Sequence, residues 1–342
     1  MADWAAQESA ARHGMACATR AGDDSLRLHS LRLLASAEVY QGRIDAGRAL
    51  ALQGLDEARR LVLRGVEARL LNTLGIAAGM QGDLVGMLEL SRQGLQIYRE
   101  TGDRVNEAIG LSNLGIGWLN LGDLVKARRD LDAALQLLRA NGDRVVESVA
   151  LANLSALALW QGQEARALAL ARQALDIAVA AQAREHAVSA GLRLGDAELA
   201  LGRLAETRRA YAQAHAWALE IGSAERHDAS AGLVRVALAQ GDTAAALAAL
   251  QPLLDQVAAG GTLDGTDLPR LIELTCHQAL ARAGDPAAAD WLARAHTALM
   301  AQADAISRDS SQHGADPALR QGFLSNIPHH REIVAAWAKR EV

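Results

Sequence analysis

The chain has 342 residues, of which 50% are hydrophobic, 3% aromatic and 22% charged, and its formal net charge is -5. At about 150 residues per domain, this length corresponds to two domains or to one long repeat array. The acidic balance leaves no basic field that would hold a nucleic acid backbone, which argues against nucleic acid as a direct partner.

The composition favours helices. Alanine and leucine dominate, and both enter helices at little cost, whereas strands are enriched in aromatic and branched side chains. All five prolines lie beyond residue 250, so most of the chain lacks the residue type that breaks helices. We therefore expect an all-α fold.

Sequence signals of secretion or membrane insertion are lacking. The two cysteines, Cys17 and Cys276, do not make a disulfide framework and suit a reducing compartment. No apolar run approaches the ~20 residues that span a bilayer, and the N-terminal residues lack the basic and apolar regions of a signal peptide. These features predict a soluble, cytoplasmic protein without a membrane partner.

Glycines followed by a polar residue recur with a period close to forty. They are Gly42, Gly82, Gly122, Gly162, Gly202, Gly241 and Gly284, at intervals of 40, 40, 40, 40, 39 and 43 residues. A second set falls halfway between them: Gly22, Gly102, Gly142 and Gly222. Glycine closes helix C-termini in the left-handed conformation, and a following Asp can cap the next helix, so each period predicts two helices.

Between these turns the apolar residues follow helical spacing. The eighth residue before each turn glycine is a leucine: Leu34, Leu74, Leu114, Leu154 and Leu194. The seventh is small: Ala35, Gly75, Gly115, Ser155 and Gly195. A small residue at a fixed place in every first helix predicts a close approach of the second helix.

This pattern resembles the tetratricopeptide repeat. Its forty-residue form is similar to the arrays of kinesin light chains, of Gram-positive peptide-pheromone receptors and of large bacterial signal-transducing ATPases. The resemblance covers about residues 3–305 and implies a right-handed α-solenoid of antiparallel helix pairs, a tetratricopeptide-like superhelix. The aromatic residue four positions before the turn is present at Trp118 and replaced at Ala78, Ala158 and Glu198.

At the N-terminus the register predicts a lone second helix over residues 3–20, so that the array begins with half a repeat. Without its partner such a helix presents an apolar stripe made of Trp4, Ala11, Met15 and Ala18, which another surface must cover unless it is tolerated as a ragged end. We favour a fragment of a longer protein. The alternative is a native chain in which this helix packs on the following pair.

Toward the C-terminus the period slips, and residues 258–267 form the longest loop candidate before one more helix pair. The polar residues 306–316 predict a second loop, and residues 317–342 predict C-terminal capping helices. The stretch from Gln321 to Trp337, with its Phe-Leu pair and His-Arg-Glu-Ile run, resembles the segment that closes tetratricopeptide arrays in bacterial cyclase or ATPase regulators. That likeness favours Val342 as the natural end.

No motif indicates an enzyme. The sequence has no phosphate loop, no G-x-G-x-x-G after an expected strand and no G-x-S-x-G elbow. His13 with Cys17, and His329 with His330, are the nearest pairs of metal-ligand types, and a structural zinc site needs four ligands. We therefore expect no catalytic site, no cofactor and no metal.

Stacked first helices would instead offer an inward face as a binding site. Positions two, six, nine, ten and thirteen residues before each turn glycine share this face. The candidate binding residues among them are Asn72, Thr73, Ile76, Met80, Asn113, Ile116, Asn120, Asn153, Trp160 and Arg193, and Arg69 and Ser112 occupy the same face.

Asn113 and Asn153 are the strongest candidates, because an asparagine amide can both donate to and accept from an extended peptide backbone. The resemblance to kinesin light chains implies this use at their repeat position. Apolar neighbours would receive ligand side chains, and Arg193 could meet a carboxylate. Alternatively, the asparagines link neighbouring first helices in a ladder, and Trp160 seals a contact between repeats.

These features predict a non-enzymatic scaffold that binds a protein segment or peptide in a concave groove, as the sensory or interaction arm of a bacterial regulator. The alternative is a self-assembly module that forms homo-oligomers without a peptide ligand. A small metabolite in the groove is a third option that no specific sequence feature supports.

Overall fold

The computed structural model describes residues 4–308 and 317–340, and these residues form seventeen helices and no strand. The all-α prediction is confirmed, and successive helices pair through short turns as a helical repeat array requires. None of the described helices is long and apolar enough to span a membrane.

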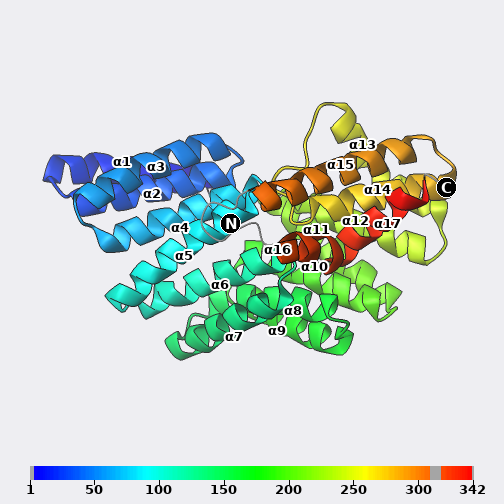
Figure 1. Ribbon diagram of the computed structural model, residues 1–342, viewed down its shortest axis with the longest axis horizontal. Helices are drawn as coiled ribbons and strands as arrows, with labels where there is room; N and C mark the ends of the chain where they lie inside the picture. Colours follow the sequence, from blue (N-terminus) through cyan, green and yellow to red (C-terminus); the bar gives the residue numbers. More distant parts are fainter. Residues whose placement is uncertain (1–3, 309–316, 341–342) are drawn as a thin grey trace. The chain divides into compact units, whose positions relative to one another are not determined.

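The chain divides into two compact units (Figure 1). Unit 1 comprises Met1–Trp118 with Arg129–Gly142, and unit 2 comprises Leu119–Arg128 with Asp143–Val342. The helices of unit 1 are α1 (Trp4–Ala21), α2 (Asp24–Tyr40), α3 (Ile44–Arg60), α4 (Arg64–Met80) and α5 (Leu84–Thr101). Two further helices contribute residues to both units: α6 (Arg104–Asn120) and α7 (Leu124–Asn141).

Unit 2 continues the same pattern of paired helices and ends in two shorter ones. They are α8 (Arg144–Trp160), α9 (Glu164–Ala180), α10 (Arg184–Ala200), α11 (Leu204–Ile221), α12 (Arg226–Ala239), α13 (Thr243–Ala258), α14 (Pro269–Ala283), α15 (Ala287–Arg308), α16 (Pro317–Ser325) and α17 (Pro328–Lys339). Helix α15 extends through Arg308, so the loop predicted from residue 306 begins at least three residues too early. The rest of that predicted loop, 309–316, lies outside the described residues.

The turn glycines have the conformation that the sequence period predicts. Gly82 and Gly102 have φ of 79° and 69°, and the Asp83 carboxylate caps α5 by accepting from the Gly86 amide at 2.8 Å. Two turns in the register lack glycine, at Val62 and Gln182, and both residues have positive φ (55° and 53°). Since side chains disfavour this region, the packing of the flanking helices holds these turns in place.

The small residue of each first helix marks a close helix contact. A Cβ on Gly115 would lie 2.5 Å from Leu131 Cγ, and one on Gly195 would lie 2.6 Å from Tyr211 Cδ1. The close approach predicted from the repeated small residue is therefore present at both positions.

A recurring ion-pair motif joins successive helix pairs of unit 1. Near the start of α4, the buried carboxylate of Glu67 accepts from Arg59 at 3.1 Å and from Arg64 at 2.7 Å. The motif repeats one period later, where Glu107 accepts from Arg99 at 3.0 Å and from Arg104 at 2.8 Å. Burial raises the pKa of Glu107, but the two arginines outweigh it and hold that pKa below its usual value.

Helix α1 packs on α2. Ala11 and Ala18 are buried, at 3% and 1% exposure, and Met15 packs against the core of unit 1. The apolar stripe expected on this helix is therefore covered by α2 and the neighbouring core at Ala11 and Ala18, and partly covered at Met15. The side chain of Trp4 lies outside the described residues.

Candidate functional site

The first helices of unit 1 (α2, α4 and α6) are linked by polar side chains on one face, which we call the first-helix face. The hydroxyls of Ser36 on α2 and Thr73 on α4 lie 3.3 Å apart. Between the next two first helices, the amide nitrogen of Asn113 on α6 donates to the side-chain oxygen of Asn72 on α4. The ladder alternative for Asn113 is thus present in the structure.

This ladder does not use the full hydrogen-bonding capacity of the two asparagines. In the described part of the chain, Asn72 Nδ2 and Asn113 Oδ1 have no further side-chain or backbone partner, and both residues are half-buried. Ile76, Ile116 and Met80 are also half-buried, whereas Thr73 is buried. The first-helix face of unit 1 therefore combines a free donor and a free acceptor with accessible apolar surface.

Two arginines and a histidine lie on the same face. Arg32 of α2 and Arg69 of α4 are half-buried, and the Nε atom of each is buried without a hydrogen-bond partner. Burial and the positive charges of Arg32 and Arg69 lower the pKa of His29. The sequence period could have indicated Arg32 and His29, because they lie ten and thirteen residues before Gly42, at positions equivalent to Asn72 and Arg69.

In unit 2 the candidate residues engage other parts of the chain. The Asn153 amide donates to the Val149 carbonyl of its own helix at 3.0 Å. The Trp160 ring lies edge-on to His329 of α17, with centroids 6.1 Å apart. Asn120 is half-buried. Asn153 and Trp160 therefore both have partners within the chain, and a ligand that used them would have to replace these contacts.

The C-terminal helices α16 and α17 pack on α15 within unit 2 (Figure 1), and α16 and Asn326 also contact the turn after α6. Asn326 donates to the Gly122 carbonyl at 3.0 Å, and the Gly322 backbone approaches the same turn. His329 and His330 are buried, and His330 Nδ1 lies 2.8 Å from the Phe323 carbonyl. Burial lowers the pKa of His330 to about 4 and that of His329 well below its usual value.

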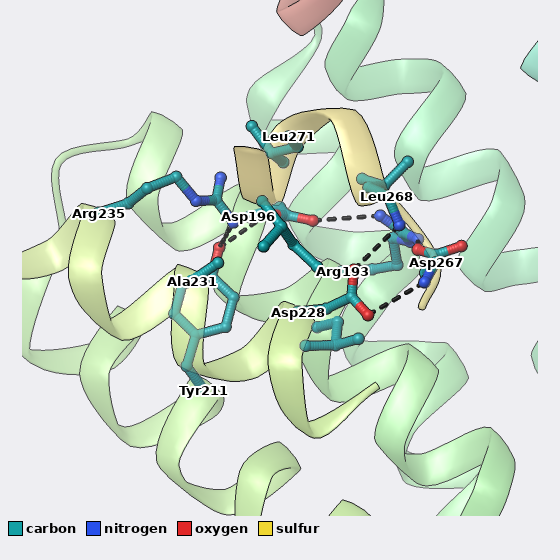
Figure 2. Close-up of a pocket in the computed structure, with 11 residues that line it drawn as sticks. Arg193, Asp196, Tyr211, Asp228, Ala231, Arg235, Asp267, Leu268 and Leu271 are labelled. Carbon is teal, nitrogen blue, oxygen red and sulfur yellow. Dashed lines mark hydrogen bonds and ion pairs between the residues drawn. The ribbon is translucent and has the colours of Figure 1, made fainter. Parts of the chain in front are cut away.

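Arg193 belongs to a buried charge network in unit 2 (Figure 2). It pairs with Asp196 at 3.2 Å and with Asp267. Asp196 also accepts from the Tyr211 hydroxyl at 2.7 Å and from Arg235 at 2.8 Å. The carboxylates that Arg193 meets therefore come from the chain itself. Burial opposes ionisation of Asp196, yet the two arginines keep the pKa of that carboxyl below its usual value.

The loop before α14 is attached to this network by Asp228. Its carboxylate accepts from the backbone amides of Asp267 at 3.0 Å and Leu268 at 2.9 Å. Burial raises the pKa of Asp228 to about 7. A small pocket with a volume of about 10 Å³ is lined by these charged residues together with Leu271 and Ile272. Since most of its charged groups pair with one another, the network acts as an internal clamp between α10, α12 and α14.

The described residues contain no group of three or more His, Cys, Asp or Glu side chains arranged to hold a metal ion. His13 and Cys17 contact each other at 3.5 Å on the α1 surface. Cys276 is buried in a core cluster of unit 2, and burial raises the pKa of its thiol to about 12, so the thiol stays protonated at neutral pH.

Paired helices with a small residue at each contact and linked first helices define a tetratricopeptide-like repeat fold. No family model and no curated protein sequence matches the chain. A Rap protein complexed with competence and sporulation factor has a similar structure, with a TM-score of 0.62 and 13% identity, over 98% of this chain and 99% of that chain.

Two further solved structures share the fold at similarly low sequence identity. Aspartyl phosphate phosphatase F from Bacillus subtilis matches with a TM-score of 0.57 and 13% identity, over 80% of this chain and 71% of that chain. The Rap conjugation gene regulator of plasmid pLS20, in complex with the Phr* peptide, matches with a TM-score of 0.53 and 11% identity, over 79% and 75%. At these identities the likeness establishes the fold.

Proposed function

We propose that the protein is a non-enzymatic scaffold that binds an extended peptide, or an extended segment of a protein, on the first-helix face of unit 1. Asn72 and Asn113 hold the peptide backbone, and Ile76, Ile116 and Met80 receive its apolar side chains. The observation that carries this proposal is the Asn72–Asn113 pair, which keeps one donor and one acceptor free beside accessible apolar surface.

The fold supports the same use. Two of the solved structures with this fold are complexes, one with competence and sporulation factor and one with the Phr* peptide. A repeat array offers an extended row of equivalent positions, which suits a peptide in extended conformation. We further propose that the protein acts as the interaction arm of a bacterial regulator, as the sequence resemblance implies.

We place the peptide on unit 1 because the equivalent residues of unit 2 have partners in the chain. Trp160 contacts His329, Asn153 bonds to Val149, and Arg193 pairs with two carboxylates. A ligand there would have to displace these contacts. On unit 1 it would displace only water from the free ends of the asparagine pair.

The proposal is tested by retention of a random-sequence octapeptide pool on the immobilised full chain. We expect the double variant Asn72→Ala with Asn113→Ala to lose at least tenfold in retention, since two backbone hydrogen bonds are lost. Asn141→Ala is the matched control, because Asn141 is exposed and bonds only weakly to the Arg104 carbonyl at 3.3 Å. Equal retention by the double variant and the control would remove the asparagine pair from the binding site.

A self-assembly module stays the alternative. Sedimentation at several concentrations separates it from the scaffold, since a monomer that retains peptides supports the scaffold only.

A further inference from the structure

Two arginines and a histidine gather beside the proposed peptide site. Arg32 precedes Ser36 by one helical turn on α2, and Arg69 precedes Thr73 by one turn on α4. Both are first helices and run in the same direction. Since the Ser36 and Thr73 hydroxyls lie 3.3 Å apart, the two arginines lie next to each other across the helix contact. His29 lies a further turn along α2.

Within the described part of the chain, these two arginines have no counter-charge. No described residue forms an ion pair or hydrogen bond with the guanidinium of Arg32 or Arg69, and both Nε atoms are buried. Arg27 and Arg235, which are also half-buried, differ: Arg27 pairs with Glu57 at 2.5 Å and Arg235 with Asp196 at 2.8 Å. The groups whose charges act on Arg32 are Arg69 and two tyrosines, with no carboxylate among them.

Such an arrangement is electrostatically unfavourable in the free protein. Burial and the positive charge of Arg69 lower the pKa of Arg32, because both disfavour its charged form. A guanidinium that is partly removed from water without a partner loses hydration that nothing replaces. An anion bound between the two arginines would supply the missing charge and the missing acceptors together.

We infer that Arg32 and Arg69 form a subsite for a carboxylate of the bound peptide, so that the preferred ligand is an acidic segment. This inference rests on the proposed function. Asn72 lies one turn after Arg69 on the same face, so a backbone held by the Asn72–Asn113 pair would place an acidic side chain, or its C-terminal carboxylate, within reach of the arginines. His29 adds a third donor at the far end of the subsite.

The first experiment uses the wild-type chain and defined octapeptide pools. One pool carries two glutamates at randomised positions, and the second carries glutamine at the same positions. Each pool is made with a free and with an amidated C-terminus, which separates a side-chain carboxylate from a terminal one. We expect the glutamate pool or the free-terminus pool to bind at least tenfold more tightly than its neutral counterpart.

The second experiment repeats the measurement with Arg32→Gln plus Arg69→Gln. We expect this variant to lose the preference for the charged pool while it retains the neutral pool. The matched control, Arg48→Gln plus Arg60→Gln, removes the same charge from exposed positions of α3 and should keep the preference. A preference that persists in the Arg32 and Arg69 variant overturns the subsite.

The outcomes separate the two claims. Equal binding of charged and neutral pools by the wild type overturns the subsite and leaves the peptide scaffold standing. Binding of no pool overturns both. The variant should remain folded, with a thermal midpoint no lower than that of the wild type, because it removes a repulsion. If the variant fails to fold, the comparison of charged and neutral peptide pools on the wild type still tests the subsite.

Discussion

His329 contacts Trp160 edge-on, with ring centroids 6.1 Å apart and ring planes inclined at 69°. The contact joins the C-terminal helix α17 to the end of α8, at a position where the repeat pattern predicts a ligand-binding residue. Within unit 2 the chain therefore covers part of its own first-helix positions. The alternative in which Trp160 seals an internal contact agrees with this geometry.

Acidification should loosen the attachment of α17. The pKa of His330 is lowered to about 4 by burial and that of His329 well below its usual value, so both are neutral when docked. The unfolded value is about 6.5, so the docked state is fully favoured above that pH and loses stability as pH falls below it. Between pH 7.5 and 5.5 we expect a loss of about 1.4 kcal/mol per histidine. Amide hydrogen exchange of α17, corrected for intrinsic rates, measures this change.

The change must be measured locally, because Glu225 and Asp228 respond with the opposite sign. Burial raises the pKa of both carboxyls to about 7, so protonation at lower pH stabilises that part of unit 2. His330→Asn is the control, because its amide can donate to the Phe323 carbonyl and does not titrate. Exchange of α17 that is equally pH-dependent in this variant would assign the effect to other groups.

Gly122→Ala should destabilise unit 2 more than Gly162→Ala. Both glycines have left-handed backbone, with φ of 74° and 69°, so both alanine variants bear a strain of about 1–2 kcal/mol. Only at Gly122 does an added Cβ meet other backbone, 2.7 Å from Gly322 C and 3.1 Å from Phe323 N, whereas Gly162 has open space. Urea unfolding and hydrogen exchange of α16 should show an additional loss of about 1–3 kcal/mol at Gly122. Equal losses would mean that α16 does not dock on this turn.

Asp196→Ala should lower the free energy of unfolding of unit 2 by about 3–5 kcal/mol, because Arg193 and Arg235 lose a shared buried carboxylate. Tyr211→Phe removes only the hydroxyl that donates to Asp196 and should cost about 1–2 kcal/mol. Urea denaturation of the three proteins measures both values. A cost below about 1 kcal/mol for Asp196→Ala would contradict the clamp.

The sequence predicts the helical array well because its determinants are local. The left-handed glycines, the capping Asp83 and the small residues at Gly115 and Gly195 are positions where one helix turn or one helix contact decides the residue. Even where glycine is missing, at Val62 and Gln182, the register continues, because packing of the flanking helices imposes the turn.

The site is less predictable because its contacts are distant in sequence. Arg193 forms an ion pair with Asp267, and Asn326 donates a hydrogen bond to Gly122. The sequence separations of these pairs do not follow from the forty-residue repeat. The amide of Asn113 was predictable as inward-facing, but its partner, Asn72, follows only from the packing of α4 and α6. Arg32 and Arg69 share the inward register, yet the absence of a counter-charge among the described residues is visible only in three dimensions.

The central claim is that peptides lie along the first-helix face of unit 1. Its most direct test is photo-crosslinking of a random octapeptide pool to the full chain with p-benzoylphenylalanine at position 76 in place of Ile76. The same probe in place of Leu52, which is 44% exposed on α3, is the reference. We predict at least tenfold more crosslinked peptide at position 76, and a drop to the reference level when Asn72 and Asn113 are both alanine. Equal yields at the two positions would contradict the account.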